Sequence, residues 1–265
     1  MYSKSQLALK YLNYYLTASN GKGHGIHSPF VFHFVTKILN DKTNYSEYGK
    51  VEDLRASLLN DKTVLTIEDF GAGSTITKMN ERTVASIAKN SAKPKKFAQL
   101  LFRMVRSYQP RTIVELGTSL GITTSYLSLA KPDAELITME GAKEVAAKAK
   151  INFQQAGLQN YSLVEGNFDN TLSAVVNGLS TVDFAFIDGN HRREPTEKYF
   201  ASLLPKTTNN SILIFDDIHW SREMEGAWET IKSHPSVRCS IDLFFIGIVV
   251  FRQEFREKQD FLIRF

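Results

Sequence analysis

Three aspartates stand at the ends of two apolar, strand-like segments. Asp188 follows DFAFI, residues 183–187, and Asp216 and Asp217 follow SILIF, residues 211–215. Because the carboxyl ends of parallel strands meet at one edge of an open sheet, these side chains are expected to converge. Converging carboxylates repel one another unless a cation lies between them, and Mg²⁺ prefers such oxygen ligands. The alternative is that one aspartate caps the next helix and the others face water.

A second candidate site is a turn that contains glycine. Gly117 and Gly121 connect the strand-like segment TIVEL, residues 112–116, to a helix expected over residues 121–130. Glycine at such a turn allows a ligand to approach the backbone at the helix N-terminus, although a tight turn without a ligand uses the same residues. Glu115 lies just before the turn, where it would repel a phosphate, and the G-x-G-x-x-G pattern is absent. The turn therefore favours a ligand that carries an ammonium group and no phosphate.

Glu140 follows the next strand-like segment, residues 135–139, and stands 25 residues after Glu115. An acidic side chain roughly 20 residues beyond such a turn accepts hydrogen bonds from ribose hydroxyls. A ribose joined to a cationic amino-acid tail describes S-adenosylmethionine, which is the expected cofactor.

Five motifs extend this expectation: VELGTSLG, ITMEG, EGNFDNTL, FIDGNH and IFDDIHW follow one another in this order. Together they resemble a class I S-adenosylmethionine-dependent methyltransferase, most of all the metal-dependent O-methyltransferases of the catechol and caffeoyl-CoA type. The resemblance covers about residues 94–252. It implies an α/β, Rossmann-like fold with a seven-stranded, mostly parallel sheet, an antiparallel last strand and helices on both faces.

The resemblance also implies the residues that bind the cofactor. Gly117 and Gly121 would surround the methionine moiety with Glu115, and Glu140 would bind the ribose. Asn167 and Phe168, which follow the strand expected over residues 161–165, would contact the adenine edge. The complete implied set is Glu115, Gly117, Thr118, Ser119, Gly121, Glu140, Asn167, Phe168 and Asp188.

The metal ligands and the catalytic base depart from the pattern of the group that the chain resembles. That group has an aspartate at the first strand end, which Asp188 matches, and an Asp-Asn pair at the second. Asp216 matches the pair, whereas Asp217 replaces its asparagine and adds a negative charge, so the choice of metal stays open. His191 occupies the position of the usual lysine base. An imidazole, whose unperturbed pKa is roughly 6.5, can accept a proton near neutrality; the alternative is a surface histidine in a turn.

Apolar periodicity predicts the elements that position these residues. From residue 94 onward, short apolar runs alternate with helical patterns, which is typical of a parallel sheet with crossover helices. The expected strands are 112–116, 135–139, 161–165, 183–187, 211–215 and an antiparallel pair near 240–244 and 247–252; the expected helices are 94–108, 121–130, 142–156, 170–178, 194–204 and 221–233. We expect a methyltransferase domain over 94–265 and a mainly helical N-terminal segment over 1–93. The glycine-rich stretch Gly71–Ser74 lacks a second acidic strand end and is interpreted as a loop near the active site.

Composition limits the remaining possibilities. The 265 residues are 43% hydrophobic and 23% charged, which excludes a disordered chain, a collagen and a coiled coil. The single cysteine, Cys239, excludes an intrachain disulfide and a cysteine-based zinc site. The absence of a long apolar run and of a signal-peptide pattern predicts a cytoplasmic protein with no membrane partner.

The expected reaction is methyl transfer to a hydroxyl group of a small molecule, with His191 as general base and Mg²⁺ or another divalent cation assisting. One alternative is a methyltransferase that acts on RNA or protein without a metal, which the net charge of +4 supports slightly. Nucleic acid is nevertheless disfavoured as a partner, because no tetrad of the N/D-P-P-Y type follows a strand. Another alternative is a non-catalytic S-adenosylmethionine-binding module. The N-terminal segment leaves room for substrate selection or for contacts in a homodimer.

Overall fold

The computed structural model describes residues 1–19, 21–69 and 78–265. These residues divide into two compact units. The first comprises Met1–Asp41 and Leu172–Phe265, and the second comprises Lys42–Thr171. The segment Gly71–Ser74, interpreted from the sequence as a loop near the active site, lies outside the described residues.

Among the described residues of the first unit, five strands lie in the order β10-β8-β9-β7-β6. β6 and β7 are parallel, β9 is antiparallel to both β7 and β8, and β10 is parallel to β8. The strands are β6 (Phe184–Ile187), β7 (Ile212–Asp216), β8 (Cys239–Asp242), β9 (Ile246–Val250) and β10 (Gln259–Leu262). β7 and β9 are buried along their whole length, because unbroken apolar runs suit strands that are covered on both faces.

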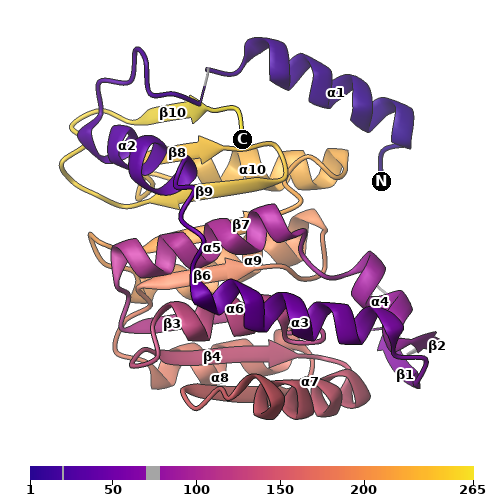
Figure 1. Cartoon of the computed structure of the whole chain (residues 1–265). Coiled ribbons are helices and arrows are strands. Elements are labelled where there is room, and N and C mark those ends of the chain that lie inside the picture. The colour runs from indigo at the N-terminus through magenta and orange to yellow at the C-terminus, as the bar shows by residue number, and fades with distance from the viewer. Residues whose placement is uncertain (20, 70–77) are drawn as a thin grey trace. The chain divides into compact units, whose positions relative to one another are not determined.

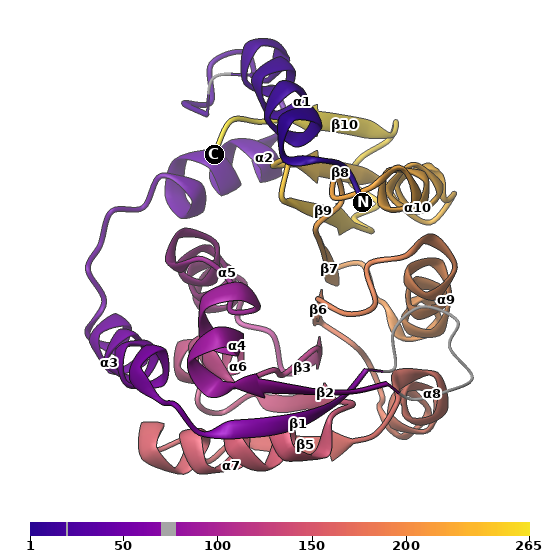
Figure 2. The same cartoon turned by 90° about the vertical axis from the view of Figure 1, so that its right-hand side faces the viewer.

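Helices of both ends of the chain belong to this unit. They are α1 (Lys4–Thr17), α2 (Pro29–His33), the π-helix η1 (Phe34–Leu39), α9 (Arg193–Leu203), the short 3₁₀-helix η2 (Leu204–Lys206) and α10 (Arg222–Ser233). Ser3 begins α1 with a capping box, in which its hydroxyl accepts from the Gln6 amide and the Gln6 side chain accepts from the Ser3 amide. Helix α1 lies beside β10 (Figures 1 and 2). An isolated bridge joins Ser19, which follows α1, to Ile263, which follows β10.

The second unit contains three parallel strands and an antiparallel hairpin among its described residues. β3 (Thr112–Leu116), β4 (Glu135–Glu140) and β5 (Tyr161–Glu165) pair in this order, and β1 (Val64–Asp69) pairs with β2 (Lys78–Thr83). The helices are α3 (Ser46–Asn60), α4 (Val84–Asn90), α5 (Lys95–Tyr108), α6 (Ile122–Ala130) and α7 (Lys143–Ala156), and α8 (Phe168–Gly178) begins here and continues into the first unit. The hairpin lies against α7 (Figure 2). The Thr66 amide in β1 donates to the Glu144 side chain in α7.

The predicted fold class is confirmed: the chain is an α/β protein with mostly parallel strands, covering helices and a helical N-terminus. The seven expected strands correspond to β3 through β9, each within two residues of its predicted bounds. β10 is an additional strand that the sequence did not predict. The boundary expected at residue 93 stays a prediction, since the compact units are divided differently. Among the described helices, none is long and apolar enough to cross a membrane.

Candidate functional site

The turn after β3 has the backbone geometry that requires glycine. Gly117 has φ 103° and Gly121 has φ 82°, and Ser119 between them is also left-handed, at φ 49°. A Cβ atom at Gly121 would overlap the ring of Phe153 in α7, so close packing as well as backbone conformation excludes a side chain there. The amides of Gly117 and Thr118 both donate to the carbonyl of Met139, each at 3.0 Å, which ties the turn to the end of β4.

Glu140 is fixed across this turn at the end of β4. Its Oε2 accepts the Ser119 amide at 2.8 Å and its Oε1 accepts the Ala142 amide at 3.0 Å. Burial raises the pKa of Glu140, while the backbone amides, including that of Gly141, favour its ionised form. The arrangement holds a carboxylate in one orientation beside a glycine turn, as the recognition of ribose hydroxyls requires.

Glu115 is enclosed within the second unit. None of its surface is exposed, and its Oε2 accepts the hydroxyls of Thr124 in α6 at 2.5 Å and of Thr138 in β4 at 2.6 Å. Burial raises the pKa of Glu115 to about 7, although both hydroxyls favour the ionised form. Its Oε1 has no hydrogen-bond partner among the described residues. Glu115 therefore links three elements beneath the turn, and its contact with a methionine moiety stays a prediction.

Asn167 and Phe168 follow β5, whose last residue pairs in register with Glu140. Gly166 precedes them at φ 128°, and the Asn167 side chain accepts the Asp169 amide at 2.9 Å where α8 begins. The second unit thus contains every residue of the implied cofactor set except Asp188, all at or next to the carboxyl ends of three adjacent strands.

The first unit contains Asp188 and the remaining reactive residues. Because β6 and β7 are parallel neighbours, with Ile187 opposite Phe215, Asp188 and Asp216 stand at adjacent strand ends. The Nε2 atom of His191 lies 3.5 Å from an oxygen of Asp188, and its Nδ1 atom lies 4.0 Å from an oxygen of Asp217. His191 and Asp217 have positive φ angles of 21° and 53°. The structure therefore brings the expected base together with two of the three predicted metal ligands.

The predicted metal centre is not assembled in this arrangement. In the part of the chain that the structure describes, no group of three or more histidines, cysteines or acidic residues could hold a metal ion. Metal ligation by Asp188, Asp216 and Asp217 stays a prediction.

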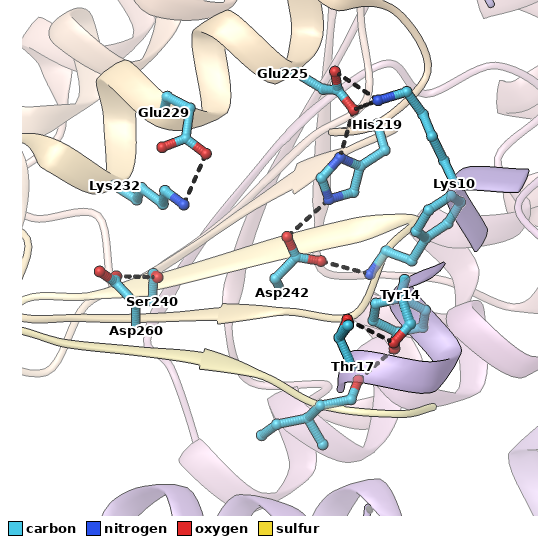
Figure 3. A network of polar contacts seen from close by, with 12 residues as sticks. Lys10, Tyr14, Thr17, His219, Glu225, Glu229, Lys232, Ser240, Asp242 and Asp260 are labelled. Carbon is cyan, nitrogen blue, oxygen red and sulfur yellow. Dashed lines mark hydrogen bonds and ion pairs between the residues drawn. The ribbon is translucent and has the colours of Figure 1, made fainter. Parts of the chain in front are cut away.

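A polar network next to the aspartate pair was not predicted from the sequence. His219 has both ring nitrogens facing carboxylates, with Nδ1 3.1 Å from Glu225 and Nε2 2.8 Å from Asp242 (Figure 3). Burial alone would lower the pKa of His219, but Asp242 and Glu225 together raise it. A cavity of about 620 Å³ adjoins the network and is also lined by Lys10 and Tyr14 of α1. The only signal in the sequence was the place of His219 two residues after Asp217.

A comparison with protein families matches residues 114–218 to a family described as a methyltransferase domain. A tRNA (guanine-N(7)-)-methyltransferase from Mycoplasma mobile is 28% identical over 100 residues, which cover 36% of this chain and 50% of that enzyme. The chain therefore matches about half the length of this curated relative.

Two solved structures extend the likeness over more of the chain. The O-methyltransferase TomG from Streptomyces achromogenes, solved with S-adenosylmethionine, has a TM-score of 0.56 at 15% identity, covering 84% of this chain and 95% of that one. A putative caffeoyl-CoA O-methyltransferase from Staphylococcus aureus has a TM-score of 0.55 at 17% identity, covering 63% of this chain and 88% of that one. The predicted resemblance is confirmed: residues 114–218 match a methyltransferase domain family, and the chain shares its fold with these solved O-methyltransferases.

Proposed function

We propose that the protein transfers the methyl group of S-adenosylmethionine to a hydroxyl group of a small molecule. The observation that carries the proposal is the fixed carboxylate of Glu140, which the Ser119 and Ala142 amides orient beside the glycine turn. S-adenosylmethionine supplies an activated methyl group, and its ribose offers two hydroxyl donors that a carboxylate in this position accepts. The fold likeness to a structure solved with S-adenosylmethionine supports the same ligand.

His191 is the proposed general base. Its Nε2 atom stands 3.5 Å from Asp188, close enough for this carboxylate to orient the ring and to stabilise the imidazolium that forms on proton uptake. In the proposed reaction the substrate O–H bond breaks and its proton passes to His191. The oxygen then attacks the methyl carbon, and the bond from that carbon to sulfur breaks, which leaves S-adenosylhomocysteine.

A divalent cation is a finer part of the proposal. Asp188, Asp216 and Asp217 are the residues that would hold it, and it would lower the pKa of a bound substrate hydroxyl. Among the described residues these side chains do not form a ready metal site, so the proton transfer is assigned to His191 alone. Turnover measured after EDTA treatment, and again after Mg²⁺ is restored, tests whether the cation takes part.

A methyltransferase acting on RNA is the second candidate, favoured by the identity to a tRNA methyltransferase and by a sequence pI of about 9.0. The two candidates differ in the acceptor that takes up a labelled methyl group. Catechols and sugar diols should be methylated under the first proposal, whereas unmodified tRNA should be methylated under the second.

Calorimetric titration with S-adenosylmethionine tests the cofactor site before any acceptor is known. Binding with a Kd in the micromolar range, about −8 kcal/mol, is expected. Absence of binding would contradict the proposed function, and binding without turnover on any acceptor would favour a non-catalytic module.

A further inference from the structure

Two residues of the N-terminal segment bind one carboxylate in α10. The Tyr2 hydroxyl donates to Oε2 of Glu225 at 2.6 Å. The Lys10 ammonium contacts Oε1 at 2.9 Å and Oε2 at 3.2 Å (Figure 3). The Glu225 side chain is only 25% exposed, and these donors, with His219, engage both of its oxygens. Such charge-assisted contacts hold a side chain that would otherwise turn toward water.

His219 connects the fixed carboxylate of Glu225 to the turn that follows β7. Its ring lies between Glu225 and Asp242 and stacks on Phe244, with ring centroids 5.1 Å apart. Asp242 is fixed in turn, since its Oδ1 accepts the Phe244 amide at 2.8 Å. His219 is therefore held on two edges and one face.

The same turn carries the acidic pair of the candidate site. The Asp217 amide donates to the Phe245 carbonyl at 2.7 Å, and the Trp220 amide donates to the Asp217 carbonyl at 2.9 Å. The Tyr2 amide also contacts this turn, since it donates to the Trp220 carbonyl at 3.1 Å. Because Asp217 has a left-handed backbone, φ 53°, its conformation persists only where the surroundings fix it.

Helix α1 reaches the turn by a second, apolar route. Tyr11 packs edge-on against Phe244 at 5.1 Å and also contacts Phe245 at 5.8 Å. Phe244 stacks on His219, and Phe245 accepts the Asp217 amide. Polar and apolar contacts from the N-terminal segment thus converge on one turn.

We propose that residues 1–17, which comprise Tyr2 and helix α1, are a positioning element for the reaction. Through Tyr2 and Lys10 they fix Glu225, which with Asp242 holds His219 and so keeps Asp217 within reach of His191. Tyr2, Lys10, Glu225 and His219 are positioning residues, because their contacts connect residues 1–17 to this turn and to Asp242 and Phe244 beside it. The roles of Asp217 and His191 in this inference rest on the proposed function. The contacts that hold the turn in place do not depend on that function.

The test uses the double variant Tyr2→Phe/Lys10→Met, which removes the donors and retains most of the side-chain bulk. Glu229→Gln is the matched control, since Glu229 lies one turn further along α10, is 65% exposed and pairs with Lys232 instead (Figure 3). Hydrogen exchange of the Asp217 and Trp220 amides and steady-state kinetics are measured for the wild type and both variants.

The double variant should speed exchange of the two amides by about tenfold, through easier local opening of the turn. It should lower kcat by about fivefold or more while the KM for S-adenosylmethionine stays unchanged, and Glu229→Gln should change neither quantity. Unchanged exchange in the double variant would overturn the inference, as would faster exchange with wild-type kcat. A wild type that neither binds nor uses S-adenosylmethionine would count against the proposed function, and the exchange result alone would then decide the inference.

Discussion

Two glutamates of the second unit have different surroundings, although each stands at the end of a strand. Glu115 and Glu140 stand at adjacent strand ends and were both predicted to touch the cofactor. Glu115 is enclosed by Thr124 and Thr138, whereas Glu140 is held by backbone amides at the turn. The sequence predicts that both carboxylates stand at strand ends, but it does not predict their different surroundings. The burial of Glu115 depends on threonines from two other elements, which no local pattern reports.

Enclosure of Glu115 predicts an unusual pH dependence of stability. Its pKa of about 7 lies above the ordinary 4.5, so the folded protein binds the extra proton. The unfolding free energy should therefore fall as pH rises from about 5 to 7, by about 2 kcal/mol, and level off above 7. Urea unfolding of the wild type and Glu115→Gln over this range measures the contribution. Parallel stability curves for the two proteins would contradict it.

Glu140 should instead act on ligand affinity. Glu140→Gln retains the size of the side chain but removes its charge and one acceptor, so S-adenosylmethionine should bind about 10- to 100-fold more weakly. Glu135→Gln, at the exposed opposite end of the same strand, is the control and should bind as the wild type does. Equal affinities for the two variants by calorimetry would remove Glu140 from the site.

His191 should affect turnover and leave cofactor binding intact. Loss of a general base costs about 100- to 10,000-fold in kcat, so His191→Ala should fall in this range with an unchanged Kd for S-adenosylmethionine. His33→Ala, which alters an exposed histidine of the same unit, should retain full turnover. Full activity of His191→Ala on the identified acceptor would show that another group takes the proton.

At the scale of elements, periodicity predicted long apolar segments well and short polar ones poorly. The strands β3 and β7 are buried at every residue and mostly apolar, and both were predicted to within a residue. β10 was missed because its four residues, QDFL, are largely exposed and offer neither an apolar run nor a clear alternation. The π-helical turn Phe34–Leu39 was also missed, since its apolar spacing is that of an ordinary helix.

The turn between β3 and α6 should be intolerant of a side chain at Gly121. Gly121→Ala combines a left-handed backbone with overlap of the Phe153 ring, and should lower the unfolding free energy by about 2–4 kcal/mol. Gly157→Ala is the matched control, because Gly157 has φ 73° but open space around it, and should cost about 1 kcal/mol. Chemical unfolding measures both losses. Equal losses would mean that the ring moves aside without cost.

At the scale of the whole molecule, each compact unit is defined by contacts and not by continuity of the sequence. Residues 1–41 belong to a compact unit with residues 172–265, and residues 42–171 form the other. The pairing of Tyr2 with Glu225 joins residues 223 positions apart. No local pattern in a single sequence reports such a pairing, and the network around His219 was therefore beyond prediction.

Removal of residues 259–265 should release α1 from the first unit. The Tyr14 hydroxyl donates to the Ile263 carbonyl, and the Arg264 amide donates to the Ser19 carbonyl at 3.0 Å. Without these partners, limited proteolysis should cut within residues 1–19 at least tenfold faster than in the full chain. Cleavage at the wild-type rate would show that the remaining contacts of α1 suffice.

The packing of α1 also has a consequence for synthesis on the ribosome. The partners that this helix contacts, from Glu225 to Ile263, emerge more than two hundred residues after it. Until then its apolar side chains, among them Tyr11 and Tyr14, have no native surface to cover them. Contacts of such long sequence separation form late, because loop closure must come first. The nascent chain therefore carries an uncovered apolar segment while the next two hundred residues are made, and we expect chaperones to bind this segment during that time.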